Sequence, residues 1–95
     1  MKNLHLTLKK KWFDLIASGE KTVEYREYKP YWEKRLIGKG FQEVHFRNGY
    51  RKNSPFMRVE CLGISFPDTF QPRNGEKLNG LQFAIYLGQV LEVEP

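Results

Sequence analysis

The sequence has a single cysteine, Cys61, among its 95 residues, so the chain cannot form an internal disulfide. A free thiol fits a reducing compartment, which predicts a cytoplasmic protein. Long hydrophobic runs are also lacking. The basic start Met1-Lys2 leads into alternating residues rather than a signal peptide, and no stretch approaches the roughly 20 apolar residues of a membrane span. We therefore expect one domain, residues 1–95, with no membrane partner and a monomeric state by default.

Motifs for metal or cofactor chemistry are missing as well. His5, His45 and Cys61 are scattered without the spacing that metal ligands adopt. The sequence has neither a glycine-rich phosphate loop nor a nucleophile elbow. We expect no metal and no other cofactor, and we interpret Cys61, on an apolar stretch, as an inert core residue.

Charge, in contrast, is abundant and unevenly distributed. The net charge is +5, and residues 1–58 contain 14 of the 16 lysines and arginines but only 6 of the 11 acidic residues. The first part of the chain therefore carries +8, and residues 59–95 carry −3. A basic half suits a polyanion such as RNA, because neutralising phosphates supplies affinity that is independent of sequence. Ordinary solubility is the alternative explanation.

Hydrophobic periodicity predicts strands and short helices in the first half of the chain. Residues 3–9 alternate between apolar and polar, which is typical of a half-buried strand. From Lys10 the apolar residues recur every three or four positions, which indicates a helix that Gly19 would end in the left-handed conformation. Pro30 is placed to begin a second short helix, and Gly38 would help to end it.

The second half of the chain predicts strands only. Residues 43–47 alternate, and residues 56–66 form a longer strand whose apolar parity changes, so we expect a bulge near Gly63. Residues 67–80 predict a loop, and residues 81–93 return to alternation as a final strand. The whole pattern predicts an α+β domain with two short helices and a small, barrel-like sheet.

The octet Gly19–Arg26, between the two predicted helices, is dense in charge. Alternation along an extended chain sets Thr22, Glu24 and Arg26 on one face. Lys21 would join them only if it lies in the turn before regular strand geometry begins. The octet is either a solvated strand edge with paired charges or a polar site. In a site, Lys21 would be a cation or a base, Glu24 an acceptor, and Arg26 a phosphate contact.

Aromatic residues alternate with cations just after this octet. Rings beside cations are what base stacking and phosphate contact require, although some of these rings would also cover a small core. Tyr28 and Tyr31 are the better candidates for stacking, because Tyr25 is expected to face inward. The candidate ligand-binding residues are Gly19, Lys21, Glu24, Arg26, Tyr28, Tyr31, Arg47, Arg51 and Lys52.

The run from Trp12 to Arg26 resembles the signature of the ASCH (activating signal cointegrator homology) domain, in which an aromatic-rich helix precedes a G-x-K-x-x-E-x-R pattern. Gly19, Lys21, Glu24 and Arg26 match its fixed positions in order. The resemblance implies a PUA-like fold, a small β-barrel of five to six mostly antiparallel strands with two short helices. It also implies a basic cleft, lined by the motif residues, that binds RNA or a nucleotide.

The same resemblance implies an alternative, a small hydrolase. Some ASCH proteins look like amidohydrolases that act on acetylated cytidine, and others are reported as ribonucleases. In such an enzyme Lys21, Glu24 and Thr22 would be the catalytic candidates. Glu24 occupies the place of the amidohydrolase threonine, which disfavours that chemistry, and Glu43 and Glu60 are only guesses for its partner glutamate. A scaffold with an inert cleft is a third interpretation.

Overall fold

The computed structural model describes residues 2–68 and 80–95, apart from the side chains of residues 66–68. The described residues form two helices and five strands: β1 (Asn3–Thr7), α1 (Lys10–Ala17), β2 (Val23–Glu27), α2 (Pro30–Leu36), β3 (Glu43–Arg47), β4 (Phe56–Asp68) and β5 (Gln82–Glu94). Neither helix is long and apolar enough to span a membrane. The molecule is therefore a small α+β fold, as the periodicity predicts.

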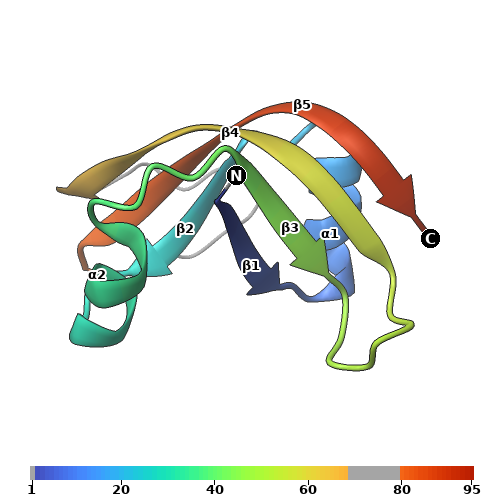
Figure 1. Cartoon of the computed structure of the whole chain (residues 1–95), viewed down its shortest axis with the longest axis horizontal. Helices are drawn as coiled ribbons and strands as arrows, with labels where there is room; N and C mark the ends of the chain where they lie inside the picture. The colour runs from blue at the N-terminus through green and yellow to red at the C-terminus, as the bar shows by residue number, and fades with distance from the viewer. Residues whose placement is uncertain (1, 69–79) are drawn as a thin grey trace.

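The five strands form one mixed sheet in the order β1-β3-β4-β5-β2. β1 pairs with β3 in parallel, and the other three strand pairs are antiparallel. Figure 1 shows that the sheet curls, with the long strands β4 and β5 arching over the shorter ones. The two edge strands are linked where Arg26 on β2 reaches the backbone oxygen of Thr7 on β1. The sheet is thus a half-barrel.

Apolar side chains from both helices and from β1, β3, β4 and β5 form one buried core. On β1 the predicted alternation is confirmed, because Leu4 and Leu6 are buried while His5 and Thr7 are exposed. Burying each large apolar side chain contributes about 1.5–3 kcal/mol. The most deeply buried large side chains are Phe46, Phe83, Ile16, Met57, Ile85, Val44 and Val59.

Both helices begin and end as their sequences predict. α1 buries Phe13 and Ile16, and Gly19 follows it with φ of 86°. The Gly19 amide donates to the carbonyl of Ile16, so the left-handed residue redirects the chain toward β2. Pro30 is the first residue of α2, and Gly38 after that helix has φ of 71°.

The long strands differ from the expected pattern in two places. The predicted bulge is confirmed at Gly63, where the register of β4 against β5 shifts and φ is 142°. However, β4 continues to Asp68, so the first residues of the predicted loop belong to a strand, and residues 69–79 lie outside the described chain. Leu91 and Val93 are over two fifths exposed, because the ends of β4 and β5 extend past the core.

Candidate functional site

Lys21 is buried, although lysine side chains rarely are. It lies in the turn between Gly19 and β2, where its amide donates to the Leu15 carbonyl at 3.0 Å. Only 2% of the residue is exposed. Because Lys21 precedes the alternation of β2, its side chain can share a side with Glu24. Its Nζ lies 3.5 Å from Glu24 Oε1.

Glu24 is the centre of the charged cluster. This residue sits on β2 opposite Ile85 and is 3% exposed. Its Oε1 accepts a hydrogen bond from the Tyr25 amide at 3.1 Å, and its Oε2 accepts one from Arg26 Nη1 at 2.6 Å. Tyr25, which was expected to face inward, is half-buried like Val23, and Glu24 is the more deeply buried residue of β2. The octet is not a solvated edge.

Arg26 is the most exposed member of this group, with 17% of its side chain accessible. Besides Glu24, its guanidinium donates to the carbonyl of Tyr25 at 2.9 Å and to that of Thr7 at 3.4 Å. We call Lys21, Glu24 and Arg26 the motif cluster. Its one carboxylate lies between two cationic side chains, so the motif cluster has a formal charge of +1.

Aromatic rings surround the cations of the motif cluster. Lys21 Nζ lies 5.3 Å from the ring centroid of Trp12 and 5.2 Å from that of Tyr25. The guanidinium carbon of Arg26 lies 5.2 Å from the centroid of Trp32. Distances of this order allow cation–π attraction. The rings therefore partly replace the water that the cations lose on burial.

The contacts continue from Trp32 to the surface of α2. The guanidinium carbon of Arg35 lies 6.0 Å from the Trp32 centroid and 5.1 Å from that of Tyr31. Trp32 and Tyr31 meet edge to face at 4.9 Å. Trp32 is partly buried against the core, and its contacts with Arg26 and Arg35 were not predicted from the sequence. The aromatic–cation alternation on α2 was the available signal.

Two other residues predicted to belong to the site lie nearby but outside the motif cluster. Thr22 is exposed, and its backbone carbonyl accepts a hydrogen bond from the Leu87 amide. Tyr28 is 47% exposed, and its ring packs edge-on against Phe83 at 5.6 Å. A hydrogen bond and the negative charge of Glu33 raise the pKa of Tyr28, with a smaller effect from burial. Its hydroxyl therefore stays protonated at neutral pH.

The remaining basic candidates lie at the end of β3 and in the connection that follows it. Arg47 ends β3, donates to the Ser54 carbonyl and stacks over Phe56. Arg51 and Lys52 are exposed in the connection from β3 to β4. Figure 1 shows this connection at the opposite end of the molecule from α2. Arg51 and Lys52 are thus far from α2, whereas Arg47 pairs in register with Thr7, whose carbonyl accepts a hydrogen bond from Arg26.

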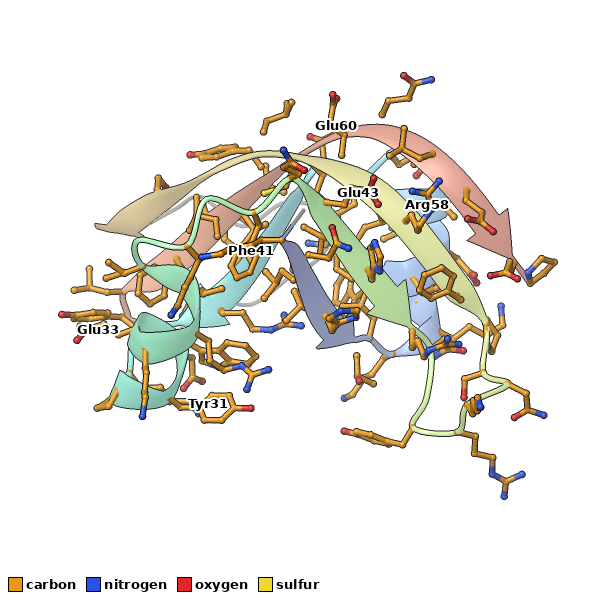
Figure 2. All side chains as sticks on the ribbon, in the orientation of Figure 1. Tyr31, Glu33, Phe41, Glu43, Arg58 and Glu60 are labelled. Atoms are coloured by element: carbon orange, nitrogen blue, oxygen red, sulfur yellow. The ribbon has the colours of Figure 1, made fainter. Side chains whose placement is uncertain are left out.

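Glu43 and Glu60 have partners of their own. Glu43 Oε1 lies 2.9 Å from both His45 Nε2 and Arg58 Nη1, and Figure 2 labels Glu43 and Arg58 near the top of the sheet. The hydrogen bonds from His45 and Arg58 lower the pKa of Glu43, against the opposing effect of burial. Glu60 is exposed and accepts a hydrogen bond from the Gln89 amide at 3.3 Å.

No protein-family model, curated protein or solved structure matches this chain. Within residues 2–68 and 80–95, the structure has no group of three histidine, cysteine or acidic side chains placed to hold a metal ion. The motif cluster consists of one carboxylate and two cations, a composition suited to contacting anionic or carbonyl groups.

Proposed function

We propose that this domain binds RNA or a nucleotide-containing ligand, as a PUA-like domain of the ASCH type. The observation that carries the proposal is the convergence of Lys21, Glu24 and Arg26, which occupy the fixed motif positions and share one ion-paired cluster. The curled five-stranded sheet with two helices is compatible with the small barrel that such a fold requires.

Energetics favour a ligand-binding role over a purely structural one. A buried group of charges costs desolvation, and replacing it with apolar side chains is often neutral or stabilising. Leu or Met at these positions would therefore stabilise the fold about as well as the motif cluster does. Arg26, at its exposed end, is placed to contact a phosphate or carbonyl group, and Tyr31, 56% exposed, offers a face for a base.

The same contacts argue against proton transfer as the main role. A general base must lie within hydrogen-bond reach of the proton that it takes, but Glu24 is only 3% exposed and its two oxygens accept hydrogen bonds from the Tyr25 amide and Arg26. Binding a ligand, in contrast, requires no proton transfer from Lys21, Glu24 or Arg26. An assay with acetylated cytidine and with RNA tests the hydrolase alternative directly, and turnover that Lys21→Met abolishes would favour it.

The binding test uses fluorescence anisotropy with a labelled single-stranded RNA. If about three phosphates are contacted, affinity should fall roughly 20-fold between about 50 and 200 mM salt. Lys21→Met and Arg26→Lys should each weaken binding more than Lys9→Ala, an exposed lysine beside α1. Circular dichroism would verify that each variant is folded. Absent binding by the wild-type protein, or binding insensitive to salt, would contradict the proposal.

A further inference from the structure

A second feature of the molecule lies beside the motif cluster but does not include it. A groove of about 530 Å³ runs between β1 and α2 and the chain that follows α2. Small-molecule sites are commonly about 300–1,000 Å³, so its size suits one mononucleotide. We call it the α2–β1 groove; its polar and aromatic wall includes Asn3, Tyr31, Lys34, Arg35, Lys39 and Phe41.

The charge of the α2–β1 groove has one sign. Lys34, Arg35 and Lys39 line it, whereas no described lining residue is acidic. Both lysines are exposed, and within the described chain neither forms an ion pair with a carboxylate. Three cations without a counter-charge attract an anion, and lysine ammonium groups bind phosphate well.

Aromatic surface lies beside these cations. Figure 2 shows Tyr31 on α2 and Phe41 on the chain between α2 and β3. Tyr31 is 56% exposed, and its ring is held between Trp32, edge-on at 4.9 Å, and Arg35 at 5.1 Å. A ring fixed by its neighbours loses little entropy on stacking, so it is well prepared to receive a planar ligand.

Asn3 supplies the third observation. Asn3 lines the groove, and its side-chain oxygen, which is buried from solvent, has no hydrogen-bond partner within the described chain. Buried acceptors are almost always satisfied, so an unsatisfied one calls for a functional explanation. An amide side chain offers a donor and an acceptor side by side, which matches the polar edge of a nucleobase.

We propose that the α2–β1 groove binds one phosphorylated nucleoside, either free or as an unstacked residue of single-stranded RNA. Lys34, Arg35 and Lys39 bind the phosphate, and Tyr31 and Phe41 contact the base. The Asn3 side chain rotates to bring its buried oxygen to the polar edge of the base. This inference rests on the proposed function and names its ligand class. Because Arg26 and Arg35 both lie near the ring of Trp32, the groove adjoins the motif cluster.

The first test titrates AMP and adenosine into isotopically labelled protein, followed by NMR. AMP should shift the Asn3 side-chain amide and the backbone amides of Tyr31 and Phe41. It should bind about tenfold more tightly than adenosine, because hydrogen bonds to charged groups are the stronger ones. A single-stranded RNA oligonucleotide forms the second arm. If RNA shifts the groove resonances and AMP does not, the ligand is a nucleotide within an RNA strand. If both shift them, the groove also binds a free nucleotide.

Variants then separate this inference from the proposed function. Lys34→Ala combined with Lys39→Ala should weaken AMP or RNA binding about tenfold or more relative to Lys9→Ala combined with Lys11→Ala, which removes the same charge elsewhere. Asn3→Leu should weaken binding without lowering stability, because it removes the unsatisfied oxygen. If the groove variants bind RNA as strongly as the control does, the groove is not the binding site, although the proposed RNA-binding function still stands. No binding of RNA or AMP by wild type would overturn both.

Discussion

The pairing of charges within the motif cluster depends on very local geometry. Lys21 reaches Glu24 because the left-handed Gly19 turns the chain before β2 begins its alternation. The sequence indicates the turn, since a glycine after an apolar helical stripe is a familiar helix end. It does not indicate that Glu24 is buried, because an isolated carboxylate would avoid the interior. The nearby Lys21 and Arg26, together with the Tyr25 amide, offset the cost of that burial.

At the residue scale, Glu43 should make stability depend on acid pH. His45, together with Arg58, holds the pKa of Glu43 below its ordinary value of 4.5 in the folded state. A lowered pKa contributes stability that is present above pH 4.5 and is lost as the pH falls through the folded pKa. Glu43→Gln removes this contribution, so its unfolding free energy should fall less steeply with acid than that of wild type.

Urea denaturation at several values between about pH 5 and pH 3 would measure this difference. Glu20→Gln is the matched control, because Glu20 is exposed in the turn before β2. It should follow the wild-type profile. Identical acid profiles for wild type and Glu43→Gln would show that the contacts with His45 and Arg58 contribute no pH-dependent stability.

At the scale of elements, local signals in the sequence identify most helices and strands. Pro30 and Gly38 mark the limits of α2, and the change of parity marks the bulge at Gly63. The strand order β1-β3-β4-β5-β2 and the parallel pairing of β1 with β3 do not follow from such signals, because they depend on contacts between distant segments. The groove between β1 and α2 also depends on contacts between distant segments, so local signals do not predict it.

The bulge in β4 provides a prediction at this scale. Gly63 has φ of 142°, a conformation that residues with a Cβ rarely adopt, although nothing lies within 4 Å of an added Cβ. Gly63→Ala should therefore destabilise the fold by about 1–3 kcal/mol through backbone strain alone. Leu62→Ala, at a position 65% exposed, should stay within about 0.5 kcal/mol of wild type. Chemical denaturation would measure both, and a neutral Gly63→Ala would contradict the strain.

At the scale of the whole molecule, the half-barrel sets two groups of exposed basic residues at separate ends. One group lies on and after α2, and another lies near the connection from β3 to β4. The uneven charge along the chain predicts a basic surface but not this division, because a count of charges does not show which residues the fold brings together in space. The group on and after α2 is the one beside the motif cluster, because Arg35 and Arg26 both lie near the ring of Trp32.

The link from Arg26 to Thr7 has a consequence for how the molecule opens. The seam between β1 and β2 is held by a side chain, where a full barrel would have a ladder of backbone hydrogen bonds. Lysine has no planar fork, so Arg26→Lys cannot contact Glu24, Tyr25 and Thr7 as arginine does. Hydrogen exchange should then quicken in β1 and β2, while the β4–β5 ladder keeps its protection. A uniform change in all strands would contradict such a seam. A ligand that binds Arg26 in place of Thr7 would likewise release the contact between β1 and β2.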